Sequence, residues 1–136
     1  MYEKAFMLEI VTPRKVVFKG EATSLSAPGT QGNFQVLYNH APLLSSLEIG
    51  KLKVKDKQGM DSSYSTSGGF VEVKKNHVVV IVETAELAKE IDIGRAKSAK
   101  QRAEERLHLK QKDIDIERAR LALLRSLNRL RIAGMS

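Results

Sequence analysis

The segment VVVIVETAELAKEIDIGRAKSAKQRAEERLH, residues 78–108, contains the change of pattern that decides the fold. It opens with five consecutive β-branched residues at 78–82, which predict a strand buried on both faces, or nearly so. From residue 92 onward Ala, Lys, Arg, Glu and Leu dominate, and all of these favour helices. The segment therefore predicts a β half followed by a helical half, with the boundary near residues 86–90.

The β half is predicted from short runs of strand-forming residues separated by turn signals. Residues 50–57 alternate cleanly, so that Leu52 and Val54 should enter a core while the lysines between them face water. Many short strands at near-regular spacing predict an all-β sandwich or barrel. Strands are expected at 7–11, 16–18, 23–27, 50–57, 64–66 and 70–73, with turns at Lys19-Gly20 and Pro28-Gly29 among those between them.

The helical half is predicted to be an αα-hairpin. Asp92 should cap a first helix that runs to His108, because its carboxylate can accept from unpaired first-turn N–H groups. After a polar break at 109–112, a second helix should begin at Asp113 or Asp115 and end near Ile132. Alanines dominate the apolar face of the first helix and bury little area, so we expect a weakly held, mobile hairpin. These faces comprise Ala96, Ala99, Ala103 and Leu107 on the first helix, and Leu123, Leu127 and Leu130 on the second.

Composition limits the possible classes of protein. The chain has 136 residues, no cysteine and a formal net charge of +7. Residues 1–85 carry 10 basic and 8 acidic side chains, whereas 86–136 carry 13 and 8, so the tail should seek an acidic or phosphate-bearing partner. The longest apolar run is far too short to cross a bilayer, which needs about 20 residues. With no signal-peptide pattern at its start, the sequence predicts a cytosolic or cytosol-facing protein.

Four segments, in order along the chain, resemble the epsilon subunit of bacterial F-type ATP synthases. They are residues 10–13 (IVTP), 32–43 (GNFQVLYNHAPL), 67–73 (SGGFVEV) and 91–96 (IDIGRA). Each motif alone is weak, but four in order with a β-then-αα layout are specific. The sequence departs from the family at Gln35, where many members have glycine, and at Tyr38-Asn39, which replaces the commoner Pro-Gly.

The resemblance implies an α+β fold and a place in a larger machine. Residues 1–86 would form a flattened β-sandwich that binds the gamma subunit and the c ring. Residues 87–136 would form an antiparallel two-helix hairpin that is mobile and regulatory. The family's members are non-catalytic rotor subunits of the central stalk, which couple proton flow to ATP synthesis. Their extended helices block ATP hydrolysis in the alpha/beta catalytic head. The protein would then lie peripherally on the cytoplasmic side of the cell membrane.

An ATP site is also implied, with no obligatory cofactor. Some members bind ATP between the folded helices and the sandwich, and this chain would bind it with or without magnesium. Arginines would surround the nucleotide with positive charge, Asp92 and Glu86 would accept hydrogen bonds or orient an arginine, and Ile91 would pack against the base. The simpler interpretation of Asp92 as an N-cap paired to Arg95 is compatible. The matching positions are Glu86, Ile91, Asp92, Arg95, Arg102, Arg125 and Arg129.

The second helix is rich in arginine and carries no acid after Glu117. One interpretation is a solvated face with local pairs such as Glu117 with Arg120. The other is that planar guanidinium groups bind carboxylates, here the acidic segment of the beta subunit, in the extended state. The residues involved would be Arg118, Arg120, Arg125, Arg129 and Arg131.

The remaining candidates have simple explanations. The three histidines are far apart in sequence and predict no metal site. The lysines at 51, 53, 55 and 57 are best explained as a solvated strand face that resists aggregation. By the resemblance, Gln31, Gly32, Asn33 and His40 would face the c ring and gamma. A basic nucleic-acid-binding module is the alternative, allowed by a pI of 9.7 but disfavoured by an aromatic content of only 5%.

Overall fold

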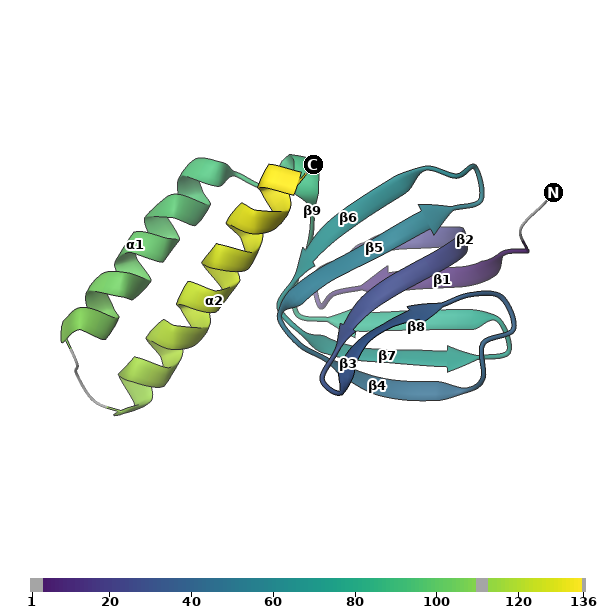
Figure 1. Cartoon of the computed structure of the whole chain (residues 1–136), viewed down its shortest axis with the longest axis horizontal. Coiled ribbons are helices and arrows are strands. Elements are labelled where there is room, and N and C mark those ends of the chain that lie inside the picture. The colour runs from purple at the N-terminus through teal and green to yellow at the C-terminus, as the bar shows by residue number, and fades with distance from the viewer. Residues whose placement is uncertain (1–3, 110–112, 136) are drawn as a thin grey trace. The chain divides into compact units, whose positions relative to one another are not determined.

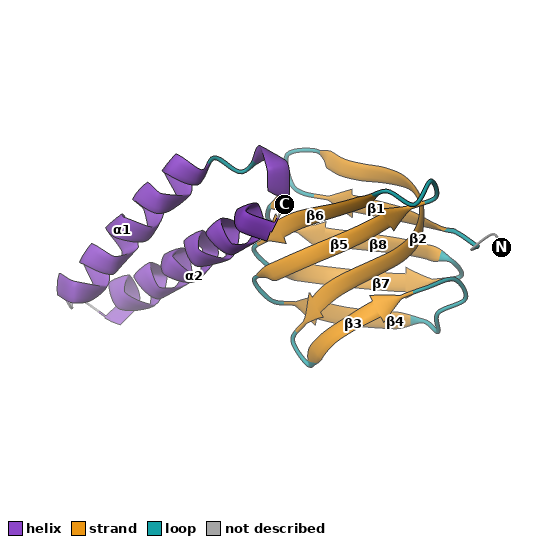
Figure 2. Cartoon of the chain, turned by 45° about the horizontal axis from the view of Figure 1, so that its top comes forward, coloured by secondary structure: helices purple, strands orange, loops and turns teal. Residues whose placement is uncertain are grey.

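The computed structural model describes residues 4–109 and 113–135 and divides the chain into two compact units, Met1–Leu87 and Ala88–Ser136. Within these residues the first unit is all strand and the second is helical (Figure 1, Figure 2). The predicted sandwich followed by a two-helix hairpin is confirmed. The strands are β1 (Phe6–Val11), β2 (Val16–Gly29), β3 (Gly32–Val36), β4 (Leu43–Leu47), β5 (Gly50–Asp56), β6 (Asp61–Thr66), β7 (Gly69–Lys74), β8 (His77–Val82) and β9 (Ala85–Leu87). The second unit contains the 3-10 turn η1 (Ala88–Glu90) and the helices α1 (Ile93–Leu109) and α2 (Asp113–Met135).

Strand β2 organises the sandwich because it belongs to both of its layers. Its first part pairs antiparallel with β1, and its second part pairs with β3 and β5. One layer therefore runs β1-β8-β7-β4, with β1 and β8 parallel, and the other runs β3-β2-β5-β6-β9. The register of β2 against β5 shifts between Ala22 and Ser24, a bulge of the kind that lets a strand bend between layers.

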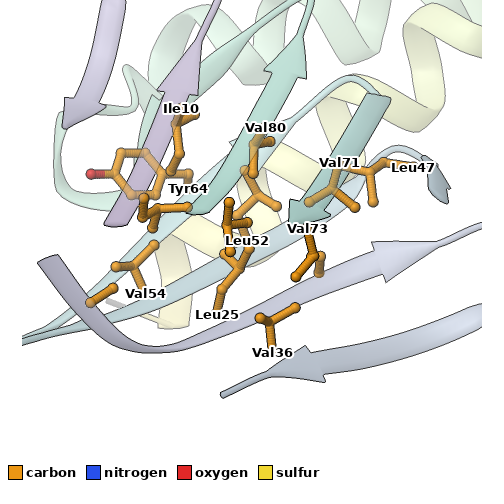
Figure 3. Close-up of a cluster of buried hydrophobic side chains, with 14 of the residues drawn as sticks. Ile10, Leu25, Val36, Leu47, Leu52, Val54, Tyr64, Val71, Val73 and Val80 are labelled. Carbon is orange, nitrogen blue, oxygen red and sulfur yellow. The ribbon is translucent and has the colours of Figure 1, made fainter. Parts of the chain in front are cut away.

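The core of the sandwich lies between these two layers. Leu8, Leu25, Leu52 and Val80 have no exposed surface, and they come from four different strands. Figure 3 shows side chains of this cluster pointing toward one another between the strands. Leu52 and Val54 are buried as the alternation predicted, while Lys53 and Lys55 on the same strand are exposed.

Two local expectations in the β half are wrong. No turn interrupts the chain at Lys19-Gly20, because both residues pair with β1, Lys19 with Glu9 and Gly20 with Leu8. Tertiary pairing therefore overrides a local turn signal. Residues 78–82 are also not buried on both faces, since Ile81 is 55% exposed. The run is a half-buried strand with an apolar outer face.

Three of the strands, β3, β4 and β9, have no clear signal in the sequence. β3 contains only two large apolar residues, Phe34 and Val36, within a Gly-Asn-Phe-Gln-Val sequence. β4 has the pattern Leu-Leu-Ser-Ser-Leu, which does not alternate, and β9 is three residues long. Each is held by its neighbours in the sheet, which single-strand patterns do not reveal.

The hairpin unit is built around small side chains. Asp92 caps α1 as predicted, because its Oδ1 accepts from the backbone N–H of Arg95 at 3.0 Å. Ala96 and Ala103 of α1 and Ala119 of α2 are almost fully buried, and α1 packs against α2. The predicted leucine face of α2 is partly wrong, since Leu127 is 42% exposed. Leu109, predicted to begin the polar break, is instead the last residue of α1, and the rest of the predicted break, residues 110–112, lies outside the described residues.

Candidate functional site

A hollow of about 510 Å3 lies on the hairpin unit, between the start of α1 and the C-terminal half of α2. Four of its five α1 residues, from Arg95 to Arg102, follow the spacing i, i+3, i+4 and i+7, which places them on one face of the helix. Small side chains at two of these positions leave the space open, while arginines stand at the other two. The hollow is lined by Asp92, Gly94, Arg95, Ser98, Ala99, Arg102 and Arg129.

The electrostatics of the hollow favour an anion. Three guanidinium groups line it against the single carboxylate of Asp92. That carboxylate already accepts a hydrogen bond from the helix backbone. Arg95 and Arg102 form no ion pair with any residue in the ranges 4–109 and 113–135. Their fork-shaped donor sets are therefore available to phosphate or carboxylate oxygens.

The structure brings together four of the seven residues predicted to bind ATP: Asp92, Arg95, Arg102 and Arg129. The other three are not among the lining residues. Glu86 lies on β9, where it pairs with Ser65. Ile91 is 7% exposed and packs with Ala88 and Ile132, and Arg125 is exposed on α2.

Three lining residues, Gly94, Ser98 and Ala99, were missed. The signal was present in the sequence, because Ser98 and Ala99 lie three and four positions after Arg95, on the helix face that also carries Arg102. Ser98 adds a hydroxyl that can donate to a phosphate oxygen.

The arginines of α2 expected to meet an acidic partner have different local settings. Arg120 pairs with Glu117 at 3.2 Å, as the simpler interpretation predicted, and Arg131 donates to Asn128 at 3.1 Å. Arg118 and Arg125 are exposed, whereas Arg129 is partly buried and lines the hollow. The face is thus only partly solvated, and its use by a partner remains a prediction.

The residues expected to face the c ring and gamma lie at opposite ends of β3. Gln31, Gly32 and Asn33 are exposed at the β2–β3 turn, which requires a glycine at 29 because a Cβ there would lie 2.7 Å from the carbonyl oxygen of Gly32. His40 follows the other end, where its Nδ1 lies 2.7 Å from the Ala41 carbonyl oxygen. Five strand residues span about 17 Å, so these residues form two surfaces and not one.

The part of the chain that the structure describes contains no candidate metal site and no candidate membrane span. No group of three or more His, Cys, Asp or Glu side chains is placed to hold a metal ion there. His77 instead pairs with Glu9 at 2.7 Å. No helix among these residues has both the length and the apolar character needed to cross a membrane.

Family models match both units. The β-sandwich domain of ATP synthase delta/epsilon chains matches residues 5–88, and their long α-helix domain matches residues 89–134. The chain thus has the architecture of the delta/epsilon chain class, a β-sandwich domain followed by a long-helix domain.

Curated relatives show which kind of delta/epsilon chain this is. The chain is 49% identical to the ATP synthase epsilon chain of Pelotomaculum thermopropionicum, over 98% of this chain and 99% of the relative. It is 47% identical to that of Desulforamulus reducens, over 96% of this chain and 98% of the relative. The chain therefore belongs to the family of ATP synthase epsilon chains. None of these matches supports the nucleic-acid-binding alternative.

Solved structures share the fold. A chain in the cryo-EM structure of the mitochondrial ATP synthase of Euglena gracilis matches with a TM-score of 0.83, at 20% identity, over 100% of this chain and 84% of that chain. A chain in the central stalk/c-ring structure of the Tetrahymena thermophila mitochondrial ATP synthase matches with a TM-score of 0.58, at 13% identity, over 99% and 98%. At these identities the likeness concerns the fold.

Proposed function

We propose that this chain is a non-catalytic rotor subunit of the ATP synthase central stalk whose hairpin binds ATP and, when free of ATP, inhibits ATP hydrolysis. In this proposal the sandwich binds the gamma subunit and the c ring, and the complex holds the protein on the cytoplasmic side of the cell membrane. Family membership supports the place in the complex. The cationic hollow on the hairpin carries the proposal that ATP is the regulatory ligand.

The hollow suits a nucleoside triphosphate in both size and charge. Its volume of about 510 Å3 is within the usual range for small-ligand sites, about 300–1,000 Å3. Arg95 and Arg102 would bind phosphate oxygens from α1, and Arg129 would bind them from α2. A ligand held by both helices stabilises the folded hairpin. Asp92 would keep its capping role and offer its remaining lone pairs to the nucleoside; the roles predicted for Glu86, Ile91 and Arg125 stay predictions.

An apolar patch on the outer face of the β1-β8-β7-β4 layer supports docking of the gamma subunit on the sandwich. Leu44, Phe70 and Ile81 are 72%, 56% and 55% exposed. Phe70 and Ile81 are direct cross-strand partners, and Leu44 on β4 lies opposite Glu72, two residues along the strand from Phe70. A patch of large exposed apolar side chains on a water-facing surface is typical of a protein interface. The β2–β3 turn with Gln31 and Asn33 would contact the c ring.

ATP would act on a two-state equilibrium of the hairpin. A ligand that binds only the folded state stabilises it by RT ln(1 + [L]/Kd), or about 1.4 kcal/mol at tenfold excess. The buried apolar surface of the hairpin is largely alanine, so an energy of this size shifts its population appreciably. When ATP falls, the hairpin would extend and set the α2 arginines against carboxylates of the catalytic head.

The test is calorimetric titration of ATP into the isolated protein, its Arg95→Ala variant and an Arg106→Ala control. Arg106 is an exposed arginine of the same helix that does not line the hollow. We expect saturable heat for the wild type and the control. The Arg95→Ala variant should bind at least about tenfold more weakly, because one charge-assisted contact is worth roughly 1.5–3 kcal/mol.

Two results would count against parts of the proposal. If the wild type gives no heat at millimolar ATP, ATP is not the regulatory ligand, and the family assignment is unaffected. If the Arg95→Ala and Arg106→Ala variants lose affinity for ATP equally, ATP binding depends on the net charge of the protein and not on the hollow.

A further inference from the structure

A second hollow lies on the sandwich, on the outer face of the layer β3-β2-β5-β6. Its volume is about 210 Å3. The sheet register explains why it exists. Ser26 stands between Gln35 and Lys53 in one row across the strands, and Ser24 stands opposite Lys55 in the next. The short serines on β2 leave a depression between the longer side chains on both sides. The hollow is lined by Ser24, Ser26, Gln35, Leu37, Lys53, Lys55 and Asp61.

The two lysines of the hollow are not held in ion pairs within the described residues. Neither Lys53 nor Lys55 forms an ion pair with a residue that the structure describes, although Lys55 is the cross-strand partner of Asp61. Glu21 is paired with Lys57 at 3.0 Å. The Asp56 carboxylate accepts from the backbone N–H groups of Gln58 and Met60. Glu21 and Asp56 are thus engaged elsewhere, and Asp61 is the one acid that lines the hollow with the two lysines.

The floor of the hollow supplies donors. Gln35 Nε2 donates to Ser24 Oγ at 2.9 Å, so the hydroxyl hydrogen of Ser24 is directed elsewhere, and Gln35 retains a second N–H. Ser26 adds another hydroxyl. Two ammonium groups and these neutral donors, against the single carboxylate of Asp61, match an anion with several acceptor oxygens. Lysine binds phosphate as a compact point charge that tolerates a range of oxygen positions.

From this arrangement we propose that the hollow on the β3-β2-β5-β6 face binds a phosphate group. The donors converge on one small depression, and four adjacent strands fix its shape. This site is separate from the ATP hollow, since every residue that lines it belongs to the sandwich unit. The lysines of β5 were expected to form only a solvated strand face. In this proposal two of them, Lys53 and Lys55, bind a ligand.

The test is a titration of pyrophosphate into 15N-labelled protein at constant ionic strength, followed by amide chemical shifts. We expect saturable shifts at the amides of Ser24, Ser26, Gln35, Lys53 and Lys55. Lys53→Gln should raise the apparent Kd about tenfold, as expected for the loss of one charged hydrogen bond. Lys51→Gln is the matched control: it removes the same charge from the same face of β5, outside the hollow, and should change the Kd by less than about twofold.

A second arm identifies the source of the phosphate. Vesicles that contain phosphatidylglycerol are sedimented with the wild type, Lys53→Gln and Lys51→Gln. Binding lost only in Lys53→Gln assigns the site to a lipid headgroup, whereas pyrophosphate binding without vesicle binding assigns it to a soluble phosphate compound. The proposal is overturned if the shifts do not saturate, if chloride at equal ionic strength reproduces them, or if Lys51→Gln weakens binding as much as Lys53→Gln. Because the readout is on sandwich amides, these outcomes do not depend on whether the hairpin binds ATP.

Discussion

At the scale of single residues, two asparagines connect the loop after β3 to the β7–β8 turn. The backbone N–H of Asn39 donates to Asn76 Oδ1 at 2.6 Å, and Asn76 Nδ2 donates to Asn39 Oδ1 at 2.9 Å. Both residues have positive φ, 63° and 60°. Asparagine tolerates this conformation better than most residues, so Asn39 can stand where the family commonly has glycine. The departure at Tyr38-Asn39 thus comes with its own hydrogen-bonded support.

Asn76→Gly is expected to lower the free energy of unfolding of the sandwich by about 1 kcal/mol, because it removes both side-chain hydrogen bonds but keeps the backbone conformation. Lys75→Gly is the control, since Lys75 also has positive φ, 50°, and makes no such bonds. It should change stability by no more than about 0.5 kcal/mol. Urea unfolding followed by circular dichroism measures both. Equal effects would show that backbone strain, and not the asparagine pair, governs this turn.

At the scale of elements, the cap of α1 has a role separate from its charge. Asp92→Ala should destabilise the first turn by about 1 kcal/mol, because α1 has no acid in its first turn to replace the lost acceptor. Asp92→Asn keeps an acceptor and should be nearly neutral for the helix. Amide exchange at Arg95 reports the difference, with roughly fivefold faster exchange in the alanine variant. If Asp92→Asn exchanges as fast as Asp92→Ala, charge at the helix N-terminus matters more than the capping bond.

Elements with a strong period were predictable from the sequence, and those defined by their neighbours were not. The alternation of β5 and the cap at Asp92 depend on local chemistry, and both were found. β3 and the unbroken course of β2 through Lys19-Gly20 depend on pairing with other strands. The hollow on the hairpin divides the same way. The α1 positions follow from helical spacing, whereas the choice of Arg129 over Arg125 from α2 depends on how the helices pack.

At the scale of the whole molecule, the two units differ in how they are stabilised. The sandwich has a continuous core that includes Leu8, Leu25, Leu52 and Val80. Each fully buried side chain of this kind contributes about 1.5–3 kcal/mol. The buried apolar residues of the hairpin are mostly alanines, with Ile91 and Ile132 near its ends. Alanine burial contributes about 0.8 kcal/mol per methyl group. The units should therefore unfold with very different stabilities.

This difference predicts the behaviour of two fragments. Residues 1–87 should fold alone, with amide chemical shifts matching those of the full chain at core positions such as Leu25 and Val80. Residues 88–136 should show only part of the ellipticity expected of two helices, because helices in proteins owe most of their stability to packing and these two bury mainly alanine. If the hollow binds ATP, millimolar ATP should raise the helical signal of this fragment and leave that of its Arg95→Ala variant unchanged. A helical fragment that melts cooperatively without ligand would contradict the weakly held hairpin on which the proposed switch depends.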